Sequence, residues 1–453
     1  MSVIDQQPSS AAAAILDGLR PDDIVAEYAS RGLADLSDAE LVAACTAVVA
    51  TPKVAEPDSF VLHAPLEVAA RARLLARIEP TARQAARQRL VWVAATYRAA
   101  GDDVPPPAAR DYGDVEAAAL DLARSVSAGD VDRADGAASY LERHADGPTL
   151  AGLTADIVVP SLAAAGHGPI LLMHALALAP LNAAGPIGLR GVIRELARRP
   201  TWTLRWFHEQ DTVAPRTAAI DHPAGDRLDL IEPLLQPRSP GPLPSNFIYP
   251  TMHLTESSGL AAEVLSAPVG SATPTSATHE LCRVAAWSML QDDRAHAPYG
   301  WSHCLTLPQA ALRVASNCTE PRHAIAVAAT YVLGSRATLG TVRLDPSWTP
   351  APSLLAAAAA GDAPMAMLDG SPDEAAAAMW VAPPAARAAL VRRLAARAAC
   401  HADAHLAKYV LACLDAAAAD PDADAEKLFL AAAAFLASWW REHPVAGDPL
   451  TAD

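Results

Sequence analysis

The sequence predicts an all-α protein that forms a single large irregular helical domain. Alanine runs dominate the 453-residue chain, leucine and arginine accompany them, and only 5% of the residues are aromatic. Alanine, leucine and arginine lose little conformational freedom on entering a helix, so this composition favours helices. Strand-like runs are few and short. No repeat of fixed length indicates a solenoid, and no glycine-rich phosphate loop follows a strand, which argues against a flavin- or NAD-dependent Rossmann enzyme.

Composition and charge narrow the classes of partner and the expected compartment. The formal net charge of −16 argues against nucleic acids and anionic membranes, because both require cationic surfaces. The six cysteines form no C-x-x-C pair, as expected of reduced thiols in a cytoplasmic protein. We expect no signal peptide and no membrane span, since no basic and apolar leader and no long apolar run is present. A disordered N-terminus is expected over residues 1–10 and the helical domain over residues 11–445.

Apolar residues at helical spacing, broken by proline- and glycine-rich segments, indicate where the helices lie. The expected helices cover residues 66–78, 82–100, 113–129, 132–145, 169–179, 187–199, 257–265, 278–290, 307–316, 322–333, 385–400, 403–417 and 425–440. The first two are separated by three residues and are expected to form an αα-hairpin. Residues 209–250 are rich in proline, aspartate and glycine, and we expect a long ordered loop or lid there, because loops of that length are usually functional or disordered.

Histidine precedes proline by two residues at the start of several apolar segments, as at His63 and His167. Proline is tolerated in the first turn of a helix, where its missing N–H costs nothing. Pro169 is therefore expected to begin a helix, with His167 just before it and His174 inside it. His63 is expected to hold the same position before a helix. Imidazoles held in this way can converge on one point, and the alternative for each is a core histidine with a hydrogen-bond partner.

The segment 401–417 places His401, His405 and Lys408 on one face of a helix, because the spacing is four and then three residues. The face continues with apolar residues, so a lysine there must either extend its charge to solvent or be neutral. A neutral ε-amine can react with CO2 to give a carbamate, which is a hard oxygen ligand suited to a divalent metal. The alternative is a lysine at the rim of the core whose stem alone is covered.

Four motifs occur in the order seen in the questin oxidase-like family, which the chain resembles over roughly residues 60 to 440. They are LHAPLEVA, HGPILLMHALA, HCLTLPQAALR and DAHLAKYVLACL, with a pair of tryptophans after the last. Each motif alone is weak, whereas four in order with compatible spacing are fairly specific. Members of this family open a ring of aromatic polyketides, notably anthraquinones, by oxidation. Some were described as Baeyer–Villiger-type oxygenases, and at least one as a non-haem iron dioxygenase.

The resemblance implies a metal centre made of four histidines and a carboxylated lysine. The matching metal ligands in this chain are His63, His167, His174, His303 and Lys408. His405 is then a reserve ligand or a partner of the carbamate, and His405 and Lys408 are expected to take part in catalysis. The implied cofactors are Fe(II), with manganese as the alternative, O2 as co-substrate and a CO2-derived carbamate on Lys408. Imidazole and carboxylate-type oxygens suit both metals.

The implied partner is a small aromatic polyketide with an anthraquinone-like ring. Four aromatic residues lie in or near loop segments and are expected to stack on such a molecule, with ordinary packing as the alternative: Trp301, Tyr299, Phe247 and Tyr249. The chain departs from the family pattern at Leu171, where arginine is frequent, and at Leu62 and Leu66, where asparagine and methionine are frequent. These departures lie beside the expected ligands and bear on the identity of the substrate more than on the metal.

Two other functions stay open at this stage. A metal-free or NADPH-assisted Baeyer–Villiger-type oxygenase would use the histidines as bases. A non-catalytic helical scaffold protein would use them as core residues.

Overall fold

Helices dominate the computed structural model, which describes residues 14–178, 188–207, 230–242, 248–360, 363–448 and 450. In chain order the α-helices are α2 Ile24–Glu27, α3 Asp38–Val49, α4 Ser59–Leu75, α5 Pro80–Ala99, α6 Val115–Ala128, α7 Val131–His144, α8 Gly147–Val158, α9 His167–Leu178, α10 Leu189–Arg198, α11 Glu232–Leu235, α12 Tyr249–Ser257, α13 Leu260–Ser271, α14 Pro274–Gln291, α15 Ser302–Arg313, α16 Pro321–Leu339, α17 Pro352–Ala358, α18 Ala363–Met367, α19 Pro372–Val381, α20 Pro384–Cys400, α21 Ala404–Ala419 and α22 Ala423–Glu442. Tighter 3₁₀ turns are η1 Pro21–Asp23, η2 Ala163–Gly166, η3 Arg205–Phe207, η4 Arg294–His296 and η6 Ala315–Asn317, and η5 Ala297–Trp301 is a π-helical turn.

The predicted all-α class is confirmed. Within the described ranges the chain forms no β-strand, and the extended backbone pairs only in two isolated bridges. The expected αα-hairpin is present as α4 and α5, and the two helices pack against each other. The structure adds helices that the sequence pattern did not indicate, among them α3, α8 and α19. In the same ranges no helix combines the length and the apolar character needed to cross a membrane.

The predicted position of His63 before a helix is wrong. α4 begins at Ser59, because the side chain of Asp58 accepts the backbone N–H of Val61 at 2.8 Å and caps the helix there. His63 therefore lies inside α4, and Pro65 lies within the helix rather than at its start. The proline removes one backbone hydrogen bond from the second turn, a cost that the strong cap and the buried face of α4 offset. The prediction holds better for His167, which begins α9 two residues before Pro169.

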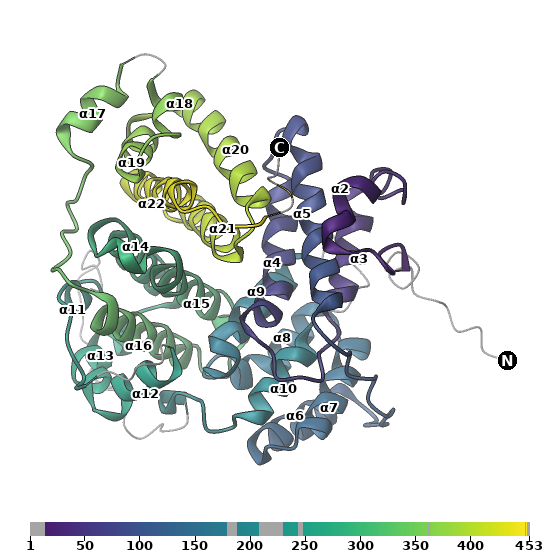
Figure 1. Cartoon of the computed structure of the whole chain (residues 1–453). Helices are drawn as coiled ribbons and strands as arrows, with labels where there is room; N and C mark the ends of the chain where they lie inside the picture. The colour runs from purple at the N-terminus through teal and green to yellow at the C-terminus, as the bar shows by residue number, and fades with distance from the viewer. Residues whose placement is uncertain are drawn as a thin grey trace.

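Helices α4 and α5 stand side by side in the middle of the molecule (Figure 1). Helices α2 and α3 flank α5 on one side, and α20 and α21 pack against the same central pair from another. One continuous hydrophobic core extends from Leu16 to Trp440. The pairing of distant parts of the chain brings the C-terminal helices onto the first long helices.

Four helices that carry predicted site residues pack as a closed ring. α4 contacts α9, α9 contacts α15, α15 contacts α21, and α21 contacts α4 again. His63, His167, His303 and Lys408 come from these four helices in that order. Residues that are hundreds of positions apart in the sequence therefore face a common interior.

Two predicted segments lie wholly or partly outside the described residues. The N-terminal residues 1–10 are outside them, as is most of the expected lid at 209–250. The described part of that stretch includes α11, where Leu234 and Leu235 are buried and their carbonyls accept hydrogen bonds from Arg336. This part of the expected lid is therefore fixed to the core.

Candidate metal centre

Four histidine rings converge inside the ring of helices. The ring centroid of His63 lies 4.4 Å from that of His167, 4.6 Å from that of His405 and 6.0 Å from that of His303. The centroid of His303 lies 5.6 Å from that of His167 and 5.0 Å from that of His405. All four side chains are buried. We call His63, His167, His303 and His405 the histidine cluster.

Three of these imidazoles are held through Nδ1 by oxygen acceptors. His63 Nδ1 donates to the carbonyl of Ser59 at 2.5 Å, and His303 Nδ1 donates to the carbonyl of Tyr299 at 2.6 Å. His405 Nδ1 donates to the carboxylate of Asp403 at 2.9 Å. Because a carbonyl can only accept, the proton is on Nδ1 and the lone pair is on Nε2 in the first two rings. Metal-binding histidines are usually oriented in this way.

The ring nitrogens that do not take part in these hydrogen bonds are the ones that could bind a cation. One ring nitrogen from each of His63, His303 and His405 lies within 4.8 Å of the other two. Nε2 of His63 and Nε2 of His303 are buried and have no hydrogen-bond partner among the described residues. Buried polar atoms rarely lack a partner, and each one costs about 1–3 kcal/mol. A divalent cation would satisfy these lone pairs together.

His167 completes the cluster and is less anchored than the other three. It is fully enclosed, and neither of its ring nitrogens has a partner within the part of the chain that the structure describes. A neutral imidazole carries one N–H donor and one acceptor, so both of these groups are unsatisfied. The ring therefore has one nitrogen lone pair that could bind a cation and one N–H that could donate a hydrogen bond.

The backbone that leads into His167 adopts a left-handed turn. Ala164, Ala165 and Gly166 have φ values of 50°, 54° and 72°. Only glycine adopts this region without penalty, and each alanine there costs of order 1–3 kcal/mol. A Cβ at Gly166 would meet Cδ1 of Leu307 at 2.4 Å, so a larger residue there would also displace the end of that leucine side chain. The turn redirects the chain so that α9 begins with His167 pointing into the cluster.

Lys408 lies among the histidines with its amine buried. The side chain is 3% exposed, and Nζ has no hydrogen-bond partner in the described ranges. Burial lowers the pKa of Lys408 to about 7, while the nearby Asp403 and Glu67 carboxylates act in the opposite direction. Neutral amine is therefore abundant at physiological pH, which is the form that reacts with CO2.

Burial also keeps the imidazoles neutral. It lowers the pKa of His63, His167 and His303 well below the ordinary value, and the positive charge of Lys408 adds to the effect on each. The pKa of His405 is lowered by the same causes, and its hydrogen bond to Asp403 acts against them. Neutral imidazole is the form that binds metals, so the cluster is ready for a cation at neutral pH.

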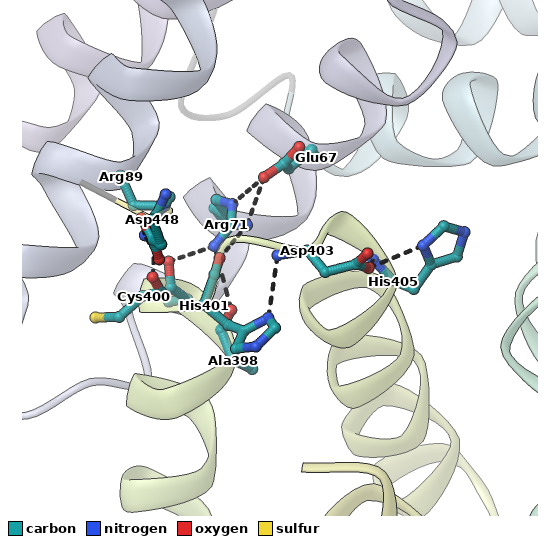
Figure 2. Close-up of polar contacts among 10 residues, drawn as sticks. Glu67, Arg71, Arg89, Ala398, Cys400, His401, Asp403, His405 and Asp448 are labelled. Atoms are coloured by element: carbon teal, nitrogen blue, oxygen red, sulfur yellow. Dashed lines mark hydrogen bonds and ion pairs between the residues drawn. The ribbon is translucent and has the colours of Figure 1, made fainter. Parts of the chain in front are cut away.

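A network of buried polar groups fixes the turn that presents His405 (Figure 2). Arg71 of α4 donates to the carbonyls at the end of α20, at 3.2 Å to Ala398, 2.5 Å to Ala399 and 2.6 Å to His401, and it also pairs with Glu67. The ring of His401 then accepts the backbone N–H of Asp403 at 3.0 Å. Asp403 caps α21 by accepting the backbone N–H of His405 at 2.7 Å. The chain of contacts from Arg71 thus ends on the carboxylate that orients the His405 ring.

The π-helical turn η5 places Tyr299 at the outer side of the cluster. The carbonyl of Tyr299 accepts from His303, and its ring meets the His405 ring edge-on at 4.9 Å between centroids. The side chain is 54% exposed, whereas His405 is 6% exposed. π-Helical turns are rare and occur often at functional sites. Tyr299 therefore connects the buried cluster with solvent.

The structure does not bring His174 into the cluster. His174 lies two turns along α9 from His167, and Arg73 donates to its Nδ1 at 3.3 Å. In the described part of the chain its ring makes no contact with the four clustered rings. Burial, the cationic Arg73 and the amine of Lys408 lower the pKa of His174 to about 3, so His174 lies outside the four clustered rings but within electrostatic reach of Lys408. His405, expected as a reserve ligand or a partner of the carbamate, is the residue whose ring nitrogen lies within 4.8 Å of those of His63 and His303.

Two of the aromatic residues expected to stack on a substrate lie in packed surroundings. Trp301 is fully buried, and the Arg336 guanidinium lies over its ring at 5.8 Å. Tyr249 stacks on Trp202 at 4.4 Å and on His253 at 5.3 Å. Phe247 lies outside the described residues, and Tyr299 is exposed beside the cluster.

Sequence reasoning missed the groups that orient the ligands. Asp403 precedes His405 by two residues, and an aspartate just before an apolar helix is a recognisable N-cap signal. The contacts of Arg71 could not be anticipated, because its carbonyl partners lie more than 320 positions away in the chain. Comparison with known proteins adds no guide, since no family model, curated protein or solved structure matches this chain.

Replacing Arg71 with lysine should lower the stability of the fold and, if the cluster holds the Fe(II) that the resemblance implies, the affinity for that ion. Lysine keeps the positive charge but loses the planar fork that reaches Glu67 and the carbonyls of α20 together. We expect a lower melting temperature and an Fe(II) affinity reduced about 10- to 100-fold, as is typical when a group that orients a ligand is lost. Thermal melts and metal titrations measure the two effects.

Arg283→Lys is the matched control for Arg71→Lys. Arg283 donates to Asp420 at 2.8 Å, and Asp420 caps the opposite end of α21. This variant should lose stability in a similar way and keep the wild-type affinity for Fe(II). Equal losses of affinity in the two variants would show that Arg71 acts on global stability alone.

Acidification should destabilise the metal-free protein, and His174 should account for part of the loss. Its pKa of about 3 in the folded state lies below the unfolded value of about 6.5. Between these values the unfolded state binds more protons, so stability falls as the pH decreases. His174→Gln should reduce the difference in unfolding free energy between pH 6.5 and pH 4.5 by about 2 kcal/mol. Denaturant titrations in EDTA at both pH values test this, and an unchanged difference would contradict it.

Proposed function

We propose that the protein is a non-haem metal-dependent oxygenase that cleaves a carbon–carbon bond in a ring of an aromatic polyketide. The observation that carries the proposal is the histidine cluster, which leaves buried nitrogens unpartnered and interacts electrostatically with the buried amine of Lys408. The order of the four motifs that resemble the questin oxidase-like family supports the reaction class. The cofactor set proposed with it is Fe(II) or manganese, O2 and a carbamate on Lys408.

The residues present fit such a metal. Imidazole nitrogen together with a hard carbamate oxygen is a donor set suited to iron or manganese. His63, His167, His303 and His405 would bind the ion through nitrogen, and a carboxylated Lys408 would bind it through oxygen. Fe(II) held there would supply the activation of O2 that aromatic ring opening requires.

The chain itself would contribute orientation, dryness and substrate contact. Ser59, Tyr299 and Asp403 hold three imidazoles in fixed directions, so little reorganisation accompanies the reaction. The helix ring excludes bulk water from the cluster. Tyr299 is exposed beside His405 and offers the face and edge of a ring to a flat substrate. A deprotonated phenol or hydroquinone bound there would be electron-rich and ready for oxidation.

The surroundings of Lys408 support its carboxylation. The neutral amine forms a bond to the carbon of CO2 and releases one proton, which replaces a would-be cation with an anion. An ammonium at this position would repel a divalent metal and would lie buried without a counterion bonded to it. The carbamate removes both problems, and binding to the metal would protect it from losing CO2.

The two alternative functions have less support. A non-catalytic scaffold would gain nothing from leaving buried nitrogens of His63, His167 and His303 without partners, since each costs about 1–3 kcal/mol. A metal-free oxygenase would need an imidazole able to take up a proton near neutral pH. Burial lowers the pKa of each clustered histidine, which makes them weak bases.

Metal analysis of histidine variants tests the proposed ligands. His303→Ala and His405→Ala should each lose the bound metal and the oxygenase activity while keeping their helical content, because a large core remains. His174→Ala is the matched control and should keep the metal, since His174 lies outside the cluster. Elemental analysis of protein purified without a histidine tag gives the stoichiometry. Wild-type protein without stoichiometric iron or manganese, or metal retained in His303→Ala, would refute the proposal.

Substitutions of Lys408 test the carbamate. Lys408→Arg should lose activity and most of the metal, because a guanidinium stays charged and forms no carbamate. Lys408→Glu should retain part of the metal and little activity, since its shorter arm misplaces the oxygen. NMR of the metal-free or zinc-substituted protein in ¹³C-bicarbonate should show a carbamate carbon in the wild type and none in Lys408→Arg. The same signal in both proteins, or in neither, would contradict carboxylation at this residue.

A further inference from the structure

A line of aromatic rings leads from the histidine cluster to the protein surface. Its distances, between ring centroids, are 4.9 Å from His405 to Tyr299, 6.2 Å from Tyr299 to Trp440 and 5.3 Å from Trp440 to Trp439. His443 stacks on Trp439 at 3.9 Å and ends the line at an exposed side chain. Each spacing is that of rings in ordinary contact.

The sequence brings these rings together through two elements. The tryptophan pair stands at the end of α22, and Tyr299 belongs to the π-helical turn η5, which packs against both α21 and α22. Trp440 is 5% exposed, and Trp439 is half-buried. Exposure thus increases along α22 from Trp440 to His443.

Tyrosine and tryptophan are the two aromatic side chains that give up one electron most readily, and neighbouring rings exchange electrons rapidly. We propose that Tyr299, Trp440 and Trp439 form a relay that carries single electrons from the surface to the histidine cluster. The inference rests on the function proposed above. The relay would reduce the oxidised metal centre when O2 has been activated and no substrate is present, and so protect the enzyme from oxidative damage.

The electrons and protons balance in the relay. One electron passes from Tyr299 toward the oxidised metal centre, and its phenolic proton goes to solvent, to which the side chain is exposed. Tyr299 then takes an electron from Trp440 and a proton from solvent, and Trp440 takes an electron from Trp439. A one-electron donor in solution, such as ascorbate, reduces Trp439 and is itself oxidised by one electron.

The surroundings of Trp440 favour transfer of the oxidised state to the next ring over its retention on Trp440. Its indole N–H is buried and has no hydrogen-bond partner among the described residues. An indole that loses an electron becomes a strong acid, and without an acceptor it keeps its proton and stays strongly oxidising. Trp440 then takes an electron from Trp439, which is partly exposed to solvent. Trp348 and Trp380 form a similar pair, 5.7 Å apart, without a contact to the cluster in the described structure.

The test exposes the Fe(II)-loaded protein to O2 without substrate and maps oxidised residues by mass spectrometry. We expect oxygen addition at Trp439 and Trp440, suppressed by ascorbate and absent from metal-free protein treated in the same way. Trp440→Phe should lower oxidation at Trp439 several-fold and raise it at Tyr299 and His405. Trp440→Tyr should restore oxidation at Trp439, because tyrosine can still pass an electron. Trp380→Phe is the control and should leave the pattern unchanged.

The outcomes separate this inference from the proposed function. Protein that binds no Fe(II) and consumes no O2 would refute both. Protein that binds Fe(II) and consumes O2, yet shows the same oxidation of Trp439 in Trp440→Phe as in the wild type, would refute the relay alone. Equal oxidation of Trp439 in Trp440→Phe and Trp440→Tyr would also refute it, because a role of Trp440 in packing alone would not distinguish the two.

Discussion

The fork of Arg71 is the contact on which the candidate centre most depends. It joins α4, which carries His63, to the turn between α20 and α21, which leads to His405 and Lys408. Arg71 is fully buried and Glu67 nearly so, and breaking such a pair from one side typically costs about 3–5 kcal/mol. The same interaction thus contributes to the fold and fixes the relative position of two helices that carry clustered histidines.

The cluster combines groups that have little reason to be together without a cation. Unpartnered nitrogens from several imidazoles face one interior, and a buried amine lies beside them. Each unsatisfied group costs stability, whereas one divalent ion and one carbamate would satisfy most of them at once. The balance of charge also improves, since the carbamate offsets part of the charge of the metal. The donor atoms alone, without the family resemblance, thus favour a bound cation.

Composition and periodicity were enough to predict the helical class and most long helices, because alanine-rich segments with periodic leucine have few other stable states. The expectation that proline marks the start of a helix failed where a capping residue earlier in the chain starts the helix instead. At α4 the cap at Asp58 overrides the proline at Pro65, so His63 lies one turn inside the helix. The choice between His174 and His405 could not be made from spacing, since it depends on which ring the packing of α9 and α21 turns inward. Arg73 donates a hydrogen bond to the ring of His174, whereas the ring of His405 donates one to Asp403.

The strained turn before His167 shows how the centre is tied to the packing of the helices. Ala164 and Ala165 adopt left-handed backbone that neither prefers, so surrounding contacts must hold them there. Leu307 occupies the space that a side chain at position 166 would need, and it lies one turn after His303 on the same face of α15. The helix that supplies His303 therefore also packs beside the turn that directs His167. The direction of the His167 imidazole thus depends on the packing of α15 as well as on its own turn.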